Sequence, residues 1–126
     1  MAGGWRVLIV DDSVDGAEIL AMLLSSMGHE TFVAHDGAGA ISVAMEKRPD
    51  LILLDLRLPD VSGYEVAKRL RDDPSFATVR LVGLSGFSSA VHRDRCLEVG
   101  IDDYYEKPID AATLEGLFDR LRPRGE

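Results

Sequence analysis

The stretch LILLDLRLPD, residues 51–60, carries a single carboxylate, Asp55, directly after an apolar run. The run is continuous in leucine and isoleucine, which is typical of a central parallel strand that is covered on both faces. A buried carboxylate destabilises a protein unless a partner group compensates for the water it loses. Asp55 therefore indicates a partner group at the place where this strand ends.

Four more apolar runs of strand length occur along the chain, at residues 5–10, 30–34, 80–85 and 103–106. Between the runs, apolar residues recur three or four positions apart, which predicts helices with one buried face. The clearest helical stripes are Ala17 with Leu20 and Leu24, Ile41 with Ala44 and Met45, Val66 with Ala67 and Leu70, and Leu114 with Leu117, Phe118 and Leu121. Residues 88–99 have no tidy apolar face, and a helix is expected there because the next strand needs a crossover.

A strand followed by a helix, repeated five times, predicts an α/β fold with a parallel sheet and right-handed crossovers. Two acidic residues, Asp36 and Asp110, are expected to cap the second and fifth helices. Gly28 stands where the first helix is expected to end.

The composition is that of one globular domain of 126 residues, of which 46% are hydrophobic and 29% charged. We expect a single domain over residues 1–126, with a structured core at about 5–121 and frayed ends. The net charge of −8 argues against direct binding to nucleic acid or to an anionic membrane, since both need clustered Lys and Arg. The lone cysteine, Cys96, and the lack of a leader-like segment favour a reducing, cytoplasmic location.

Three carboxylates are expected at the carboxyl edge of the sheet, where open parallel α/β sheets bind their ligands. Asp11 and Asp12 directly follow the first strand, and Asp55 ends the third. If these two strands are neighbours, the three side chains converge in one crevice. Two like charges about 4 Å apart repel by ~4 kcal/mol at an effective dielectric constant of about 20. A hard divalent cation offsets this repulsion, so the sequence predicts a Mg²⁺ site.

Two further strand ends carry groups suited to phosphate chemistry. Ser85 places a hydroxyl at the end of the fourth strand, and Lys107 places an ammonium group just after the fifth. An aspartate can act as a nucleophile and form an aspartyl phosphate, while a metal, a hydroxyl and a lysine stabilise charge on the phosphoryl oxygens. Together with Asp55 and the acidic pair, these residues indicate a phosphoryl-transfer site.

The sequence resembles the receiver domains of response regulators over nearly its whole length. Four segments carry the resemblance, in the order and spacing of the family: VLIVDDS, LILLDLRLPDVSG, LVGLSG and GIDDYYEKP. The resemblance implies a doubly wound, flavodoxin-like sheet of five parallel strands in the order 2-1-3-4-5, for which a chemotaxis receiver is a standard example. It also implies a function in two-component phosphorelay signalling.

The resemblance assigns a role to each acidic residue. Asp55 would be the phosphoacceptor and a ligand of Mg²⁺. Asp12 would bind Mg²⁺ directly, Asp11 would act mainly through water, and the main-chain carbonyl of Arg57 would be a further ligand. The side chains of Arg57 and Phe87 would flank the acyl phosphate, and their bulk predicts slow hydrolysis because it restricts the attacking water.

The resemblance also implies a switch. Ser85 would move onto the phosphoryl group, Lys107 would bind that group as a cation, and Tyr104 would be the aromatic switch residue. The Lys107–Pro108 bond is expected to be cis, an isomer that only an X–Pro bond adopts at low cost.

A receiver of this kind would take its phosphoryl group from a histidine kinase or a histidine phosphotransfer protein. It would signal to an output partner through the face formed by its fourth helix, fifth strand and fifth helix. It would be a monomer or a weak homodimer, and it would catalyse only its own phosphorylation and dephosphorylation, so that it is not a turnover enzyme.

Three other functions fit the residues less well. An unphosphorylated docking module is compatible with the site but does not require it. A Mg²⁺-dependent phosphatase with an aspartate nucleophile needs that residue after the first strand with a second aspartate two positions on, a spacing that DDSVD lacks. A flavin-binding domain needs a phosphate loop after the first strand, where Asp11 and Asp12 would repel a phosphate.

Each motif also has an ordinary explanation when taken alone, as an acidic cap, a turn or a solvated lysine. Their positions at successive strand ends favour the functional interpretation. His29, His35 and His92 have no metal-binding spacing and are expected on the surface. Cys96 is expected to pack beneath the fourth helix.

Overall fold

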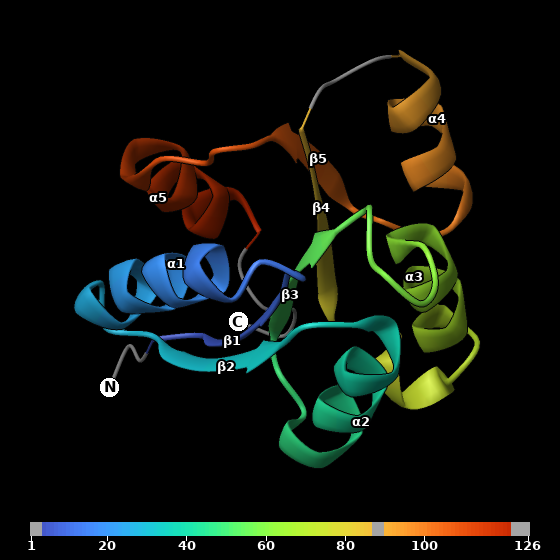
Figure 1. Cartoon of the computed structure of the whole chain (residues 1–126), viewed down its shortest axis with the longest axis horizontal. Helices are drawn as coiled ribbons and strands as arrows, with labels where there is room; N and C mark the ends of the chain where they lie inside the picture. The colour runs from blue at the N-terminus through green and yellow to red at the C-terminus, as the bar shows by residue number, and fades with distance from the viewer. Residues whose placement is uncertain (1–3, 87–89, 122–126) are drawn as a thin grey trace.

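The computed structural model describes residues 4–86 and 90–121, which form one parallel sheet between two layers of helices (Figure 1). The five strands are hydrogen-bonded in the order β2-β1-β3-β4-β5. This confirms the predicted fold class and strand order, and the first strand begins one residue later than expected. The strands are β1 (Arg6–Val10), β2 (Glu30–Ala34), β3 (Leu51–Asp55), β4 (Arg80–Ser85) and β5 (Asp103–Glu106).

Helices connect the strands, as predicted. They are α1 (Val14–Ser26), α2 (Gly37–Lys47), α3 (Gly63–Arg71), α4 (Ala90–Glu98) and α5 (Ala111–Arg120). A short 3-10 helix, η1 (Pro74–Phe76), follows α3 and was not predicted. α1 and α5 cover one face of the sheet, and α2, α3 and α4 cover the other (Figure 1). Within the described residues, no helix has the length and apolar character needed to cross a membrane.

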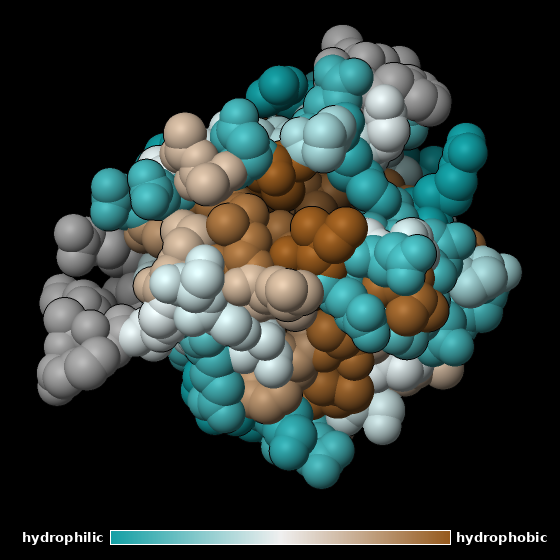
Figure 2. Space-filling model, turned by 60° about the vertical axis from the view of Figure 1, so that its left-hand side comes forward, coloured by the Kyte–Doolittle hydropathy of each residue, from teal (hydrophilic) through white to brown (hydrophobic). Residues whose placement is uncertain are grey.

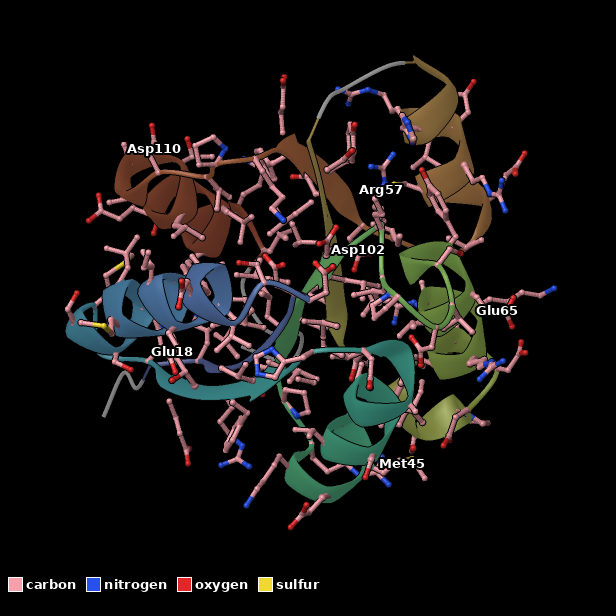
Figure 3. The ribbon with its side chains drawn as sticks, viewed as in Figure 1. Glu18, Met45, Arg57, Glu65, Asp102 and Asp110 are labelled. Carbon is pink, nitrogen blue, oxygen red and sulfur yellow. The ribbon has the colours of Figure 1, made fainter. Side chains whose placement is uncertain are left out.

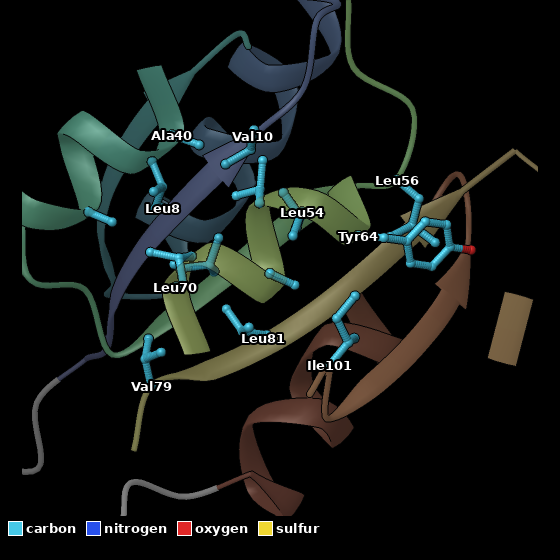
Figure 4. Packing of buried hydrophobic residues seen from close by; sticks show 14 of the residues in the cluster. Leu8, Val10, Ala40, Leu54, Leu56, Tyr64, Leu70, Val79, Leu81 and Ile101 are labelled. Atoms are coloured by element: carbon cyan, nitrogen blue, oxygen red, sulfur yellow. The ribbon is translucent and has the colours of Figure 1, made fainter. Parts of the chain in front are cut away.

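The side chains of the central strands alternate between two buried clusters, one on each face of the sheet. Leu8 and Leu54 belong to the cluster under α2, α3 and α4 (Figure 4), whereas Ile9 and Leu53 belong to the cluster under α1 and α5. A fully buried side chain of this kind contributes about 1.5–3 kcal/mol relative to an exposed one. Burial on both faces explains why β1, β3 and β4 are nearly continuous apolar runs.

The buried face of α2 differs from the predicted stripe. Ala40 and Ala44 are fully buried, and Ile41 is half-buried beside them. Met45 is 48% exposed, so its assignment to the stripe was wrong. Ala40 and Ala44 are about one helical turn apart and share a face, whereas Met45 lies about 100° further round the helix than Ala44.

The helix ends follow the sequence closely. The carboxylates of Asp36 and Asp110 cap α2 and α5 as predicted, each accepting a backbone N–H from the first turn. Gly28 follows the end of α1 with a φ of +95°, a conformation that glycine adopts without strain. Cys96 is buried on α4, as expected. Residues 88 and 89, which were expected in this helix, lie outside the described residues.

Two of the three histidines are not the surface residues that the sequence suggested. His29 is half-buried: its Nδ1 accepts the backbone N–H of Trp5 at 2.9 Å, and its ring stacks on Phe118 with a centroid separation of 4.2 Å. His92 is half-buried between elements of the opposite face. His35 is exposed, as expected, although its Nδ1 lies 3.0 Å from the backbone carbonyl oxygen of Asp11, the residue after β1.

His29 should make the stability of the fold depend on pH. Burial lowers the pKa of its imidazole, and a protonated Nδ1 could not accept the N–H of Trp5. As the pH falls through about 6.5, the unfolded state therefore takes up a proton before the folded state does, and the free energy of unfolding decreases. Above that pH, the stabilisation by neutral His29 is fully present.

Urea unfolding of the wild type and of His29→Phe between about pH 5 and pH 8 tests this role. The variant keeps a ring against Phe118 but loses the acceptor for Trp5, so at neutral pH it should be less stable by about 1 kcal/mol. Below about pH 6.5 the difference in the free energy of unfolding between the two proteins should narrow, because only the wild type is destabilised by protonation of His29 in the unfolded state. An equal pH dependence in the two proteins would show that His29 does not titrate with folding.

Candidate functional site

Four side chains from four different strand ends meet at the carboxyl edge of the sheet. Asp11 follows β1, Asp55 ends β3, Ser85 ends β4 and Lys107 follows β5. β1 and β3 are neighbours, which is the arrangement needed for their carboxylates to converge. A cleft of about 430 Å³ opens at this edge and is lined by Asp12, Asp55, Leu56, Arg57, Tyr64, Ser85, Gly86, His92 and Lys107.

The ammonium group of Lys107 contacts two buried carboxylates. Its Nζ lies 3.0 Å from Oδ2 of Asp11 and 3.2 Å from Oδ2 of Asp55. The two aspartate side chains are only 9% and 7% exposed, so they have given up most of their hydration. A shared cation offsets part of that loss, and Lys107 is therefore the partner that a carboxylate at the end of β3 requires.

Burial and hydrogen bonding act in opposite directions on the pKa of Asp55. Burial raises this pKa, while the N–H of Arg57, which donates to Oδ1 at 3.0 Å, and the ammonium of Lys107 lower it. Burial is the larger effect, so the pKa of Asp55 is raised overall. Burial alone would lower the pKa of Lys107, but the carboxylates of Asp11 and Asp55 outweigh it and raise that pKa. Lys107 is thus a cation at neutral pH.

The carboxylates of Asp11, Asp12 and Asp55 could together hold a metal ion. One oxygen from each lies within 4.8 Å of the others, with Asp12 exposed and the other two buried. Three negative charges beside one lysine leave an excess of negative charge, and carboxylate oxygens are the ligands that Mg²⁺ prefers. The donor set therefore fits a hard divalent cation. Arg57 lies next to this group, on the loop between β3 and α3 (Figure 3), and lines the cleft.

Ser85 and Tyr104 lie on the same face of the sheet, on neighbouring strands. In the register of β4 and β5, Tyr104 is paired with Gly83, two residues before Ser85. Both side chains are therefore on the side of α3 and α4, and both are buried. The carbonyl of Ser85 accepts the N–H of Lys107 at 2.6 Å, and the Lys107–Pro108 bond is cis, as expected.

Asp60, on the loop after β3, and Gly63, the first residue of α3, shape the site although no role was predicted for them from the sequence. Gly63 begins α3 so close to β3 that a Cβ there would lie 2.4 Å from the carbonyl oxygen of Asp55. Asp60 accepts the backbone N–H groups of Gly37 and Ala38 at 2.8 Å and 3.0 Å, which ties this loop to the start of α2. These hydrogen bonds lower the pKa of Asp60. The glycine in LPDVSG was a signal for the close approach, but nothing local points from Asp60 to α2.

Tyr64 and His92 also line the wall of the cleft, although the sequence did not indicate them as site residues. They lie 28 residues apart on different helices, so no spacing rule connects them. Phe87, which was expected to flank the acyl phosphate together with Arg57, lies outside the described residues.

An apolar groove of about 410 Å³ adjoins the charged site. Its apolar lining comes from α1, from β4 and from the segment after β5: Ile19, Leu20, Leu23, Leu84, Pro108 and Ile109. Asp11 and Lys107 also line it, so the groove borders directly on the carboxylate pair. Figure 2, which turns the α1 and α5 side towards the viewer, shows apolar side chains gathered in the middle of this side and hydrophilic ones around them.

Comparison with known proteins identifies the family. The family model described as response regulator receiver domain matches residues 7–119. The chain belongs to this family. Receiver domains act in two-component signalling, where the phosphoacceptor role is general to the family and the interaction partners are histidine kinases and output domains.

The receiver is similar to regulators of different length. It is 36% identical over 103 residues to the polar-differentiation response regulator DivK of Brucella anthropi, a match that covers 82% of this chain and 84% of DivK. It is 37% identical over 124 residues to the phosphate regulon transcriptional regulatory protein PhoB of Pseudomonas aeruginosa. That match covers 95% of this chain but 54% of PhoB, so the receiver spans about half the length of that relative.

Solved structures show the same fold. Chemotaxis protein CheY4 of Vibrio cholerae matches with a TM-score of 0.89 at 28% identity, covering 95% of this chain and 99% of CheY4. The receiver domain of the sensor histidine kinase PA1611 from Pseudomonas aeruginosa matches with a TM-score of 0.85 at 29% identity, covering 94% and 98% of the two chains. The PA1611 structure is described with a magnesium ion coordinated in the active site cleft.

Replacing Lys107 should raise the pKa of Asp55 further. In Lys107→Met, the buried carboxylate of Asp55 loses its cation and is left with the like charge of Asp11. The carboxyl ¹³C chemical shift of Asp55, followed through an acid titration, measures this change. Lys68→Met, an exposed position on α3, is the matched control and should leave the titration of Asp55 unchanged. If Lys107→Met left it unchanged as well, the ion pair would not govern the charge of Asp55.

Proposed function

We propose that Asp55 accepts a phosphoryl group from a histidine kinase or a histidine phosphotransfer protein, and that this modification changes which partner the receiver binds. The observation that carries the proposal is the pair of buried carboxylates, Asp11 and Asp55, that share the ammonium of Lys107 beside an open cleft. Family membership supports it, because the phosphoacceptor role is general among receivers.

Asp55 would act as the nucleophile. A carboxylate oxygen of Asp55 forms a bond to phosphorus, the phosphorus–nitrogen bond of the donor's phosphohistidine breaks, and the released imidazole takes up a proton. The ammonium group of Lys107 would exchange its contact with Asp55 for one with a phosphoryl oxygen, and it would retain its ion pair with Asp11. The hydroxyl of Ser85, on the strand next to Asp55, would donate to another phosphoryl oxygen.

The acidic group would hold Mg²⁺ for this reaction. Asp12, Asp55 and the main-chain carbonyl of Arg57 would bind the ion directly, and Asp11 would act through water. When bound, Mg²⁺ would supply positive charge to the phosphoryl oxygens and reduce the repulsion among the carboxylates. The magnesium ion described for the PA1611 receiver supports this assignment.

The donor has to bring its phosphohistidine to Asp55, and we expect its surface to bind at the apolar groove beside Lys107. Ser85 and Tyr104, on the face covered by α3 and α4, would form the switch, and α4, β5 and α5 would present the changed surface to the output partner. The slow hydrolysis predicted from Arg57 and Phe87 stays a prediction, and a decay rate of the acyl phosphate that is unchanged in Arg57→Ala and in Phe87→Ala would contradict it.

Intact-mass measurement after incubation with acetyl phosphate tests the proposal. In the presence of Mg²⁺, the wild type should gain the mass of one phosphoryl group and lose it again at alkaline pH, as an acyl phosphate does. Asp55→Asn should gain none. Asp15→Asn removes an exposed carboxylate from the first turn of α1 and should behave like the wild type. Without Mg²⁺, the gain should fall strongly.

Two outcomes would overturn the assignment. A wild type that gains no phosphoryl group although it binds Mg²⁺ would favour the alternative function, a docking module that works without phosphorylation. A gain that persists in Asp55→Asn would show that another residue is the acceptor.

A further inference from the structure

Aromatic rings from three different elements stack beside the cleft. His92 of α4 stacks on Tyr64 of α3 and on Tyr104 of β5, with centroid separations of 6.3 Å in both cases and interplanar angles of 8° and 19°. The hydroxyl of Tyr64 lies 2.6 Å from Nδ1 of His92, within hydrogen-bond distance. The guanidinium of Arg95, also on α4, lies 4.7 Å from the Tyr64 ring. We call the contact of Tyr64 with His92 the aromatic latch.

The aromatic latch is part of the phosphorylation cleft. Tyr64 and His92 line the same cleft as Asp55 and Ser85. Tyr64 is 8% exposed and lies near Leu56 (Figure 4), the residue that follows Asp55. A movement of α4 away from Tyr64 would therefore open one wall of the cleft.

The described side chains of α4, residues 92–98, bury few groups against the rest of the molecule. Among residues 92–98, whose side chains the structure describes, only Cys96 is fully buried, and Leu97 is 66% exposed. α5, in contrast, buries Leu114, Leu117 and Phe118. An element with so few buried contacts opens at a low free-energy cost, so a single latch on it has a large influence on its position.

The Tyr64 hydroxyl is not needed for filling space. A phenylalanine would cover the same apolar surface without an O–H group that has to be hydrogen-bonded once it is buried. Burial raises the pKa of Tyr64, so the phenol is protonated at neutral pH and can donate to Nδ1 of a neutral imidazole. The hydroxyl thus adds a hydrogen bond between α3 and α4 that apolar packing of the ring would not provide.

We infer that the aromatic latch holds α4 against α3 and Tyr104 in its buried position next to Ser85, and that it thereby sets how readily Asp55 takes a phosphoryl group. This inference rests on the proposed function of Asp55. His92 is a positioning residue in it, since it acts through Tyr104 and α4. When the latch is broken, α4 lies against α3 in a smaller fraction of the molecules, and the rate of phosphorylation falls with that fraction.

Two single variants and their combination test the aromatic latch. Tyr64→Phe removes only the hydroxyl, and His92→Leu removes the nitrogen that faces it. The initial rate of phosphorylation by acetyl phosphate with Mg²⁺, measured by intact mass, should fall about threefold or more in each. The double variant should be no slower than the slower single variant, because both changes remove the same bond. His92→Gln keeps a hydrogen-bond acceptor and should recover part of the rate.

Tyr105→Phe is the matched control. It also removes one tyrosine hydroxyl from this region, but Tyr105 packs on the opposite face of the sheet, and its hydroxyl donates to Asp103. Its phosphorylation rate should equal that of the wild type. Amide hydrogen exchange in α4 should become faster in Tyr64→Phe and His92→Leu but not in Tyr105→Phe.

The outcomes separate the inference from the proposed function. A wild type that is not phosphorylated overturns the proposed function and, with it, the role of the latch. A phosphorylated wild type with equal rates in Tyr64→Phe and His92→Leu overturns the latch alone. Variants that lose thermal stability but keep the wild-type rate overturn it too, because the contact would then be structural only.

Discussion

The site depends on one cation shared by two carboxylates that the fold has taken out of water. Without Lys107, Asp11 and Asp55 would repel each other in a place where solvent screens them poorly. The same lysine is fixed from its backbone, because its N–H is bonded to the carbonyl of Ser85. Lys107 therefore connects the ends of β1, β3, β4 and β5, and a change in charge at Asp55 reaches all four strand ends directly.

The strand order explains why these groups meet at all. β1 has β2 on one side and β3 on the other, so the chain leaves β1 for α1 on one face and leaves β3 for α3 on the opposite face. The two connections diverge above neighbouring strands and leave a crevice between them. Asp11 and Asp55 are the residues at these two strand ends, and both carboxylates contact Lys107 there. A buried parallel sheet thus provides both the low exposure of the two carboxylates and the crevice through which a phosphoryl group could reach them.

What could be predicted from the sequence was local or followed from the topology. A few neighbouring residues in the sequence are enough to recognise an apolar run of strand length, a capping residue such as Asp36, or a polar residue at a strand end such as Asp55. Met45 was misplaced because a stripe of mixed small and large residues leaves the rotation of a helix uncertain by one position. The contact of Tyr64 with His92 could not be found, because it depends on how α3 and α4 are packed and on a hydrogen bond between residues far apart in the chain.

The helices on the two faces of the sheet are held in place by buried packing of different strength. Because side chains alternate along a strand, Asp11 and Asp55 lie on the same face as Ile9 and Leu53. This face is covered by α1 and α5, which are anchored by large buried residues such as Leu24 and Phe118. Ser85 and Tyr104 belong to the other face, where Cys96 is the one fully buried residue among the described side chains of α4, residues 92–98. A change of charge at the edge acts on both faces, but displacement is largest where the opposing packing is weakest. The response to the proposed phosphorylation should therefore concentrate on α4, which contacts α3 through the hydrogen bond between the Tyr64 hydroxyl and Nδ1 of His92.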